Sequence, residues 1–572
     1  EGYWSDHWHY NTDLIENYLA IFPDRVKELF LDRGDYIFYD DNYFVEPRNV
    51  KYVLFRGKPR QLRGVRHDPE KAALISSRTK DKNAVRSGFG QGEVYHTNLL
   101  GKLLCVIANK YASLDPEGLG VEMETDKPNW CDALNGLPGL FGSSSAESLE
   151  LLRLVAFLNR ELAAIEKTAV TGIAGEVAGF LDELIRITGA NAGDFDFWDK
   201  THTAKENFRE KTRLGISGDN VSWTMEKVRE ALSVFERKLS ECCSKLEAIA
   251  NNGIIPTCFE FQPVDYRIDE NADEKLSPAA KARTANFAAH ESGATAVAMA
   301  VSKEKAQPIV ITSFKRNDLP LFLEGPVHYL RLCPQRDTAE IFHRNMLASP
   351  LYDKKLDMIK VNAPLTSASQ DIGRITVFTP GWLENESVWL HMEYKYLLEL
   401  LRNGLSAEFF KIARTALVPF FDSAVYGRSI YENSSFIVSS AHPDASTHGQ
   451  GFVARLSGAT AEFISMWIAM TSGLKPFSLR EGKLCLALRP SLPSDFFSDS
   501  GIFAFNFLGS CRVVYHNESR KDTFGPQAAR VQSYRIIWKN GEVEEISGEY
   551  ISGKTAFAVR EGNVKTIEVK LG

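Results

Sequence analysis

Through the first 473 residues, apolar positions recur every three or four residues, which is the spacing of amphipathic helices. The pattern predicts helices over about 12–22, 95–112, 145–166, 171–188 and 223–254. The serines at 143–145, followed by Glu147 and Glu150, predict a capped start for the third of these helices. The chain is therefore expected to be mostly helical up to residue 473.

Strict alternation of apolar and polar residues, which favours strands, appears in three other places. A stretch rich in Tyr, Phe and Val over 35–66 predicts a short hairpin or extended excursion. Alternating segments flank a run of small residues in 255–323, which predicts an inserted segment of helix and strand. From residue 474 the pattern is continuously strand-like, and Asn540-Gly541 marks a hairpin turn.

The composition excludes several classes of protein and leaves the predicted helices and strands unchanged. A chain of 572 residues with 44% hydrophobic and 25% charged residues is long enough for two or three globular domains. Its net charge of -7 argues against a broad nucleic-acid surface. There is no apolar run long enough to span a membrane and no signal peptide at the start. The 8 cysteines form no CxxC pair, which favours reduced thiols in a cytosol, and no metal-ligand cluster is convincing.

Candidate chemistry centres on the loop from Gly120 to Gly142, which holds Trp130 and Asp132. An indole can pack on a sugar ring while a neighbouring carboxylic acid protonates a glycosidic oxygen. Such an acid needs a raised pKa, which the apolar residues 134, 137 and 140 would supply by desolvation. The alternative is that Trp130 is a core residue and Asp132 caps the loop.

Three further places carry residues suited to binding. Aromatic and polar residues around Trp4 and Asp6 precede the first helix, as a sugar subsite or as a hydrophobic end cap. His391 lies at the head of a predicted helix, where it is either a phosphate donor or an ordinary hydrogen-bonded residue. Ser457 and Gly458 open another helix, as an anion site or as a simple N-cap.

The loop sequence NWCDALNGLPGLFG resembles the general-acid loop of the cellobiose phosphorylase-like family of inverting glycoside phosphorylases. That family usually has Asp-Trp-Asn-Asp-Gly-Met-Asn at this place. Trp130, Asp132 and Asn135 match the motif, while Cys131 and Ala133 replace its central Asn and Gly.

Two more segments resemble the same family, in the same order along the chain. Glu384 and Asn385 match the start of Glu-Asn-Gly-Gly-x-x-x-His, and His391 falls on its phosphate-binding His, although Glu386-Ser387 replace the glycines. Ser457 and Gly458 match the phosphate-binding Ser-Gly or Thr-Gly. The resemblance further implies that Asp6 holds the transferred sugar, and that a phosphate-binding Arg would lie upstream of Glu1.

The resemblance implies a mainly α fold, an (α/α)6 catalytic barrel over 1–473 that is incomplete at its start and carries an insertion at about 255–323. A C-terminal antiparallel β-sandwich or jelly roll would occupy 474–572. The family's own amino-terminal β-sandwich is not seen in the sequence.

The implied activity is that of a cytoplasmic hexosyltransferase, and homodimers are usual for the family. Inorganic phosphate, a co-substrate rather than a cofactor, would attack a terminal β-glucosidic bond of a β-1,3- or β-1,4-oligoglucan and release α-glucose 1-phosphate. Asp132 would be the acid; Trp4, Asp6, Trp130 and Asn135 would bind sugar; His391, Ser457 and Gly458 would bind phosphate; no metal is needed. The alternatives are an inverting hydrolase with Glu384 or Glu393 as base, and a non-catalytic carbohydrate-binding fragment.

Overall fold

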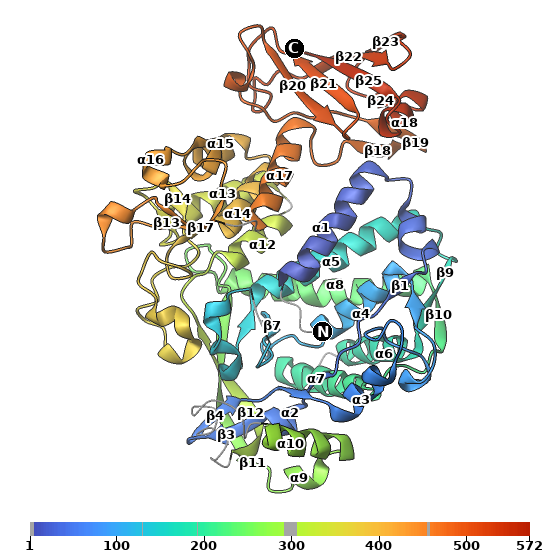
Figure 1. The fold of residues 1–572 in the computed structure, drawn as a ribbon, viewed down its shortest axis with the longest axis vertical. Coiled ribbons are helices and arrows are strands. Elements are labelled where there is room, and N and C mark those ends of the chain that lie inside the picture. Colours follow the sequence, from blue (N-terminus) through green and yellow to red (C-terminus); the bar gives the residue numbers. More distant parts are fainter. Residues whose placement is uncertain (1–4, 128–129, 191–192, 291–305, 334, 455–457) are drawn as a thin grey trace. The chain divides into compact units, whose positions relative to one another are not determined.

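A computed structural model describes the chain except for residues 1–4, 128–129, 191–192, 291–305, 334 and 455–457. Helices account for 43% and strands for 23% of the structure. The chain forms two compact units (Figure 1). Unit 1 comprises Glu1–Trp8, Lys27–Gly325 and Leu365–Val377, and unit 2 comprises His9–Val26, Pro326–Pro364 and Phe378–Gly572. Each unit is described by itself.

One helix of unit 1 is almost completely buried. This helix is α5 (Ser145–Glu161), which contacts α4 (Leu99–Tyr111) and α8 (Met225–Ala248). Leu149, Leu154 and Leu158 bury their side chains along it. A helix buried on all sides belongs to the centre of a packed unit. The other helices are α2 (Arg48–Lys51), α3 (Pro69–Ser77), α6 (Gly175–Gly189), α7 (Asp194–Lys211), α9 (Ala272–Lys275) and α10 (Pro278–His290).

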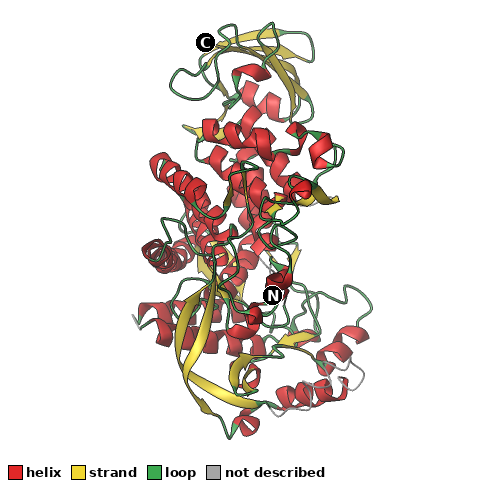
Figure 2. Ribbon diagram, turned by 90° about the vertical axis from the view of Figure 1, so that its left-hand side faces the viewer, coloured by secondary structure: helices red, strands yellow, loops and turns green. Residues whose placement is uncertain are grey.

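A six-stranded sheet, in the order β4-β3-β12-β11-β8-β7, is the largest sheet of unit 1. Its long strands β11 (Cys258–Ile268) and β12 (Gln307–Asp318) pair antiparallel and form the twisted yellow ribbon of Figure 2. The short strand β8 (Ser143–Ser144) joins β11 to β7 (Val121–Glu122). The remaining strands are β1 (Tyr36–Ile37), β2 (Tyr43–Val45), β3 (Tyr52–Phe55), β4 (Lys58–Gln61), β5 (Val65–His67), β6 (His96–Thr97), β9 (Val170–Ala174) and β10 (Asn220–Thr224).

Unit 2 also has a central buried helix, α14 (Leu390–Arg402), which packs against α15 (Ser406–Ala416) and α17 (Gly458–Thr471). Immediately before α14, β15 (Val388–Trp389) pairs with β16 (Ser434–Ile437), which pairs with β17 (Gly451–Ala454). The chain thus brings the start of α14 close to the segment that leads into α17. Further elements are α12 (Glu324–Leu332), α13 (Arg336–Ala348), α16 (Ser423–Tyr426), β13 (Tyr352–Asp353) and β14 (Met358–Ile359). Helix α1 (Ser5–Ile21) contributes residues to both units.

The C-terminal strands form two sheets within unit 2. One has the order β18-β19-β24 and the other β20-β21-β25-β22-β23. Pairing of β22 with β23 confirms the hairpin predicted from Asn540-Gly541. The bounds are β18 (Phe477–Arg480), β19 (Lys483–Leu486), β20 (Ile502–Phe507), β21 (Cys511–His516), β22 (Val531–Trp538), β23 (Val543–Ser547), β24 (Ile551–Ser552), α18 (Lys554–Arg560) and β25 (Val564–Leu571).

The fold class predicted from the sequence is wrong. Many small sheets and the six-stranded sheet are not those of a mainly α (α/α)6 barrel with a C-terminal antiparallel sandwich. The C-terminal sheet is mixed, because β25 inserts between β21 and β22 and runs parallel to β21. Alternation along a strand reveals which face is buried but not the direction of its partner, so the pairing lay outside what the pattern specifies. The domain boundary near 473 stays a prediction.

Two predicted helices also begin later than expected. Residues 170–174 and 220–224 pair as the antiparallel strands β9 and β10, and α6 and α8 start only after them. The β-branched residues Val170, Thr171 and Ile173 favour this extended conformation. Helix α5 does start at Ser145, but its N-cap residue Ser144 makes no side-chain capping hydrogen bond, contrary to the predicted cap.

Candidate functional site

The loop that carries Asp132 is closed at its base inside unit 1. Strand β7 leads into the loop and β8 leads out of it, and the two pair with each other. The amide of Met123 donates to the carbonyl of Gly142 at 2.8 Å, and Ser143 Oγ donates to the buried carboxylate of Asp115 at 2.7 Å. The loop is therefore an excursion from a fixed sheet edge.

Asp132 opens a 3-10 turn, Asp132–Leu134, and its side chain is exposed. Trp130 is half-buried, and the apolar residues Leu134, Leu137 and Leu140 are buried beneath the turn. The prediction that Asp132 lies on a loop is confirmed. These leucines are buried, yet the carboxylate of Asp132 stays exposed.

Asn135 is hydrogen-bonded to a second segment of unit 1. Its Oδ1 accepts a hydrogen bond from the amide of Arg374 at 3.1 Å, and the amide of Gly136 donates to Ile372 at 3.0 Å. Gly373 has φ +135°, and a Cβ there would lie 2.5 Å from the carbonyl oxygen of Ala133. Only glycine permits this approach, which holds the turn after Asp132 in place. A sugar-binding role for Asn135 stays a prediction.

In unit 2, two segments predicted to bind phosphate lie against each other. Helix α17 begins at Gly458, and α14 begins one residue before His391, as the sequence predicted. A Cβ at Gly458 would lie 2.2 Å from His391 Nε2 and 2.4 Å from Cε1, so the imidazole packs directly on the first residue of α17. Ser457, the third predicted phosphate ligand, lies outside the described residues.

The hydrogen bonds around His391 include two residues that the motifs did not indicate. Tyr10 Oη lies 2.6 Å from His391 Nε2 and donates to Glu462 Oε1 at 2.7 Å. A hydroxyl that donates its proton to a carboxylate must accept from the imidazole, so this network assigns the proton to Nε2. Lys395 Nζ lies 5.2 Å from the centre of the Tyr10 ring. The cluster is buried and contains two basic groups beside a helix N-terminus, where anions are favoured.

Tyr10 and Glu462 carried no sequence signal of their own. Tyr10 belonged to the aromatic opening of the chain, and Glu462 is one helical turn beyond Gly458. The i, i+4 spacing of Gly458 and Glu462 was the only available hint that they share a face of α17.

The turn before β15 is held in an unusual conformation. Glu386 has φ +56°, a conformation that favours glycine. Its carboxylate forms a buried ion pair with Lys360 at 2.8 Å, and its amide donates to Asn362 Oδ1 at 2.5 Å. These contacts maintain a glycine-like backbone at a non-glycine residue.

The remaining predicted positions are Asp6, Trp4 and the two candidate bases of a hydrolase. Asp6 is half-buried in the first turn of α1, next to His7, whose pKa is lowered by burial despite the opposing charge of Asp6. Trp4 lies outside the described residues. Of the two candidate bases for a hydrolase, Glu393 is completely buried, and burial raises its pKa well above the usual value. Glu384 is half-buried in the turn before β15.

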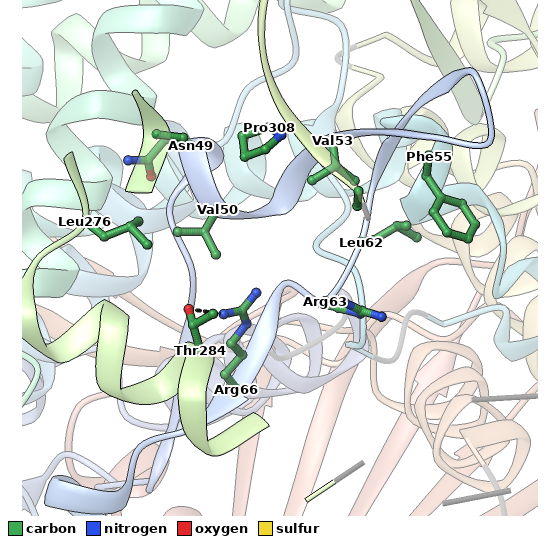
Figure 3. A pocket seen from close by; sticks show the side chains of 12 residues that line it. Asn49, Val50, Val53, Phe55, Leu62, Arg63, Arg66, Leu276, Thr284 and Pro308 are labelled. Atoms are coloured by element: carbon green, nitrogen blue, oxygen red, sulfur yellow. Dashed lines mark hydrogen bonds between the residues drawn. The ribbon is translucent and has the colours of Figure 1, made fainter. Parts of the chain in front are cut away.

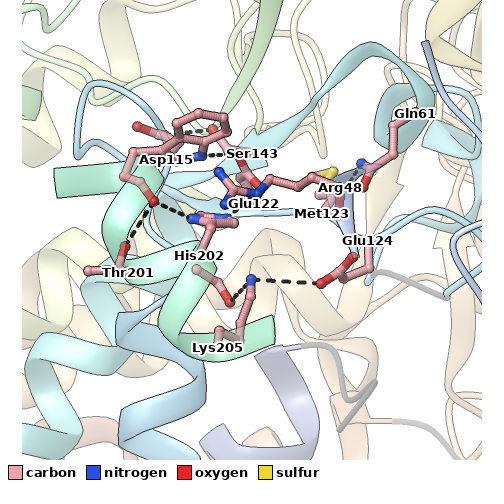
Figure 4. A network of polar contacts seen from close by, with 12 residues as sticks. Arg48, Gln61, Asp115, Glu122, Met123, Glu124, Ser143, Thr201, His202 and Lys205 are labelled. Carbon is pink, nitrogen blue, oxygen red and sulfur yellow. Dashed lines mark hydrogen bonds and ion pairs between the residues drawn. The ribbon is translucent and has the colours of Figure 1, made fainter. Parts of the chain in front are cut away.

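Unit 1 also contains a buried polar network that the sequence did not reveal (Figure 4). Glu122 and Glu124 lie on the segment entering the Asp132 loop and point toward His202 and Lys205 of α7. Charged residues on a helix ordinarily predict a solvent-facing side, which is why those of α7 gave no signal.

Two cavities of unit 1 contain none of the predicted site residues. The cavity in Figure 3 has a volume of about 160 Å³ and is bordered by apolar side chains with Arg63 and Arg66, the latter bonded to Thr284. The second, of about 410 Å³, lies beside Arg48, Trp198 and Arg283.

No protein-family model matches the chain, and no curated protein matches it significantly. Within the described residues, no helix combines the length and apolar character needed to cross a membrane.

Proposed function

We propose that the protein is an inverting glycoside phosphorylase acting on a terminal β-glucosidic bond of a β-1,3- or β-1,4-oligoglucan. The observation that carries this proposal is the packing of His391 on Gly458, because two motifs recognised separately in the sequence converge on one buried basic cluster. A basic side chain at a helix N-terminus suits a phosphate. We further propose a cytoplasmic location.

In the proposed reaction, a phosphate oxygen attacks the anomeric carbon as the glycosidic C–O bond breaks. Asp132 gives its proton to the departing oxygen, and inversion yields α-glucose 1-phosphate and a shortened acceptor. Phosphate is already an anionic nucleophile, so no second carboxylate is required as a base. The exposed position of Asp132 leaves it accessible to a saccharide, and Trp130 and Asp6 would hold the transferred glucosyl unit.

His391 would serve phosphate in one of two ways. Its Nε2 proton is directed to Tyr10, so phosphate would either displace the Tyr10 hydroxyl or use the other ring nitrogen of an imidazolium. The negative charge of Glu462 opposes a bound anion, and Lys395 together with the N-terminus of α17 would offset it.

A synthetic-direction assay tests the proposal. Phosphate release from α-glucose 1-phosphate is measured with glucose, cellobiose, laminaribiose and sophorose as acceptors. We expect release with one acceptor and a loss of at least about a hundredfold in Asp132→Asn, because removal of a general acid costs that much. Asp81→Asn, at an exposed turn carboxylate with φ +43°, is the matched control.

The cluster around His391 and Gly458, here called the phosphate cluster, is tested separately in the phosphorolytic direction. Gly458→Ala should raise the KM for phosphate at least about tenfold, because the new methyl group displaces the His391 ring. Gly175→Ala is the control, since it also changes the first residue of a long helix but its Cβ meets only Asp219 at 3.4 Å. Glucan cleavage that proceeds equally well without phosphate would contradict the proposal and favour the hydrolase.

A further inference from the structure

The segment that enters the Asp132 loop carries two carboxylates in succession on the same side, with side-chain exposures of only 9% and 15%. Glu122 ends β7, and Glu124 follows two residues later. Both face α7 (Figure 4). Buried carboxylates are costly unless they are paired, and so they mark places where orientation is fixed by specific partners.

Glu122 is bound by two side chains of α7. Trp198 Nε1 donates to its Oε1 at 2.6 Å, and His202 Nε2 lies 2.8 Å from its Oε2. The other imidazole nitrogen, Nδ1, lies 2.9 Å from the carbonyl oxygen of Trp198. Both ring nitrogens therefore face acceptors. Burial opposes ionisation of Glu122, but His202 and Lys205 outweigh it and lower its pKa, so this group is a carboxylate. Burial also lowers the pKa of His202, against the opposing effect of the Glu122 charge.

Glu124 is bound by three basic side chains. It pairs with Lys51 at the end of α2, with Arg209 Nη1 at 2.9 Å and with Lys205 Nζ at 3.8 Å. Burial opposes ionisation here as well, yet these charges hold the pKa of Glu124 well below its usual range. The carboxylate is ionised and attached to both α7 and α2.

Residues of the same segment also accept hydrogen bonds from Gln61 and Gly64. Gln61 Nε2 donates to the carbonyls of Met123 at 3.1 Å and Pro138 at 3.0 Å, which ties the entering and leaving limbs of the loop together. The amide of Gly64 donates to Thr125 Oγ1 at 3.1 Å. Beyond Thr125, the side chain of Asp126 is exposed. These bonds hold the entering segment up to Thr125, while the contacts of Asn135 and Gly136 hold the turn after Asp132.

We infer that Glu122 and Glu124 are positioning residues that set the placement of Asp132 through the α7 residues His202, Lys205 and Arg209. The inference rests on the proposed function, in which Asp132 is the general acid. A general acid must reach the leaving oxygen within hydrogen-bond distance, and a displacement of about 1 Å can cost a hundredfold in rate. The contacts of Glu122 and Glu124 with α7, which we call the ionic clamp, fix this placement from a helix rather than from the exposed turn itself.

Glu124→Gln tests the inference, because it keeps the shape of the side chain and removes its charge. The control is Glu46→Gln, which removes a still more deeply buried charge, from the bidentate pair with Arg283 at 2.8 and 2.9 Å. We expect Glu124→Gln to lower kcat for glucan phosphorolysis by about tenfold to a hundredfold with little change in the KM for phosphate. Glu46→Gln should keep the wild-type kcat.

A substrate whose leaving group needs no proton distinguishes a positioning role from a general loss of active structure. β-Glucosyl fluoride loses fluoride with little need for a proton, so its phosphorolysis should be nearly unaffected in Glu124→Gln, as in Asp132→Asn. An equal loss of rate with glucan and with glucosyl fluoride would overturn the positioning role. Glu122→Gln is the second variant if Glu124→Gln does not fold.

Hydrogen exchange gives a readout that does not depend on turnover. Amides in peptides spanning 121–136 should exchange faster in Glu124→Gln than in the wild type and in Glu46→Gln. Unchanged exchange in these peptides would refute the clamp even if the enzyme is active. Conversely, faster exchange in a protein that turns over no substrate would support the clamp and count against the proposed function alone.

Discussion

Lys205 shows how much a single residue in a buried network depends on its surroundings. Its amino group donates to Ser113 Oγ at 2.9 Å and lies among Glu124, Arg209 and Lys51. Burial lowers the pKa of Lys205 to about 7, because the nearby cations partly cancel the favourable effect of Glu124. Folding therefore removes a proton from this lysine at neutral to basic pH.

This proton release predicts a pH-dependent stability. Between about pH 7 and the ordinary lysine pKa, the unfolded chain binds a proton that the folded chain has lost, so stability rises with pH. The unfolding free energy of the wild type minus that of Lys205→Met should increase by roughly 1 kcal/mol per pH unit from pH 7 to 9. Denaturant unfolding at several pH values measures it.

The control is Lys200→Met, which removes an exposed lysine from the same helix, α7. A difference between wild type and Lys205→Met that stays constant from pH 7 to 9 would show that Lys205 keeps its proton in the folded protein.

At the scale of elements, the turn from Gly381 to Ser387 determines how α14 begins. Gly381 has φ +81°, and a Cβ there would lie 2.6 Å from the amide nitrogen of His442, so glycine is required. Glu386 adopts its positive φ with the help of Lys360 and Asn362. The sequence indicated the turn and the helix, but the partners that hold Glu386 in this conformation come from a separate segment.

This arrangement predicts a specific double-mutant result. Lys360→Met leaves the Glu386 carboxylate buried and unpaired and should destabilise the protein by about 3–5 kcal/mol. Adding Glu386→Gly removes that carboxylate and relieves backbone strain of about 1 kcal/mol, so the double variant should be more stable than Lys360→Met alone. Thermal or denaturant unfolding of both variants measures this, and a double variant less stable than Lys360→Met would contradict the explanation.

For the whole molecule, the proposed phosphate cluster predicts a linkage between ligand and stability. A ligand that binds only the folded chain stabilises it by about 2.7 kcal/mol at one hundred times its Kd. Phosphate should therefore raise the Tm of the intact chain relative to chloride at the same ionic strength. This rise should be lost in His391→Gln.

The control is His343→Gln, which changes another buried histidine of unit 2 that is hydrogen-bonded to a tyrosine, Tyr396, at 2.7 Å. It should retain the response to phosphate. An equal phosphate response in His391→Gln would remove His391 from the proposed site.

The sequence by itself determined the local features of this protein. Periodicity located α4, α5, α14 and α17, because apolar spacing reflects which side of a helix is buried. Motif spacing placed Asp132 on a loop and His391 and Gly458 at helix starts. These features depend on neighbouring residues along the chain.

The tertiary structure alone decided the sheet order, the parallel pairing of β21 with β25, and the partners of the buried charges. Glu124, Lys51 and Arg209 come from three separate segments, as do Tyr10, His391 and Glu462. A charged residue has the same local pattern whether it faces solvent or a buried counterion, and a strand has the same alternation in either pairing direction. Only the folded chain distinguishes these cases, because burial and pairing are properties of residues that meet from far apart.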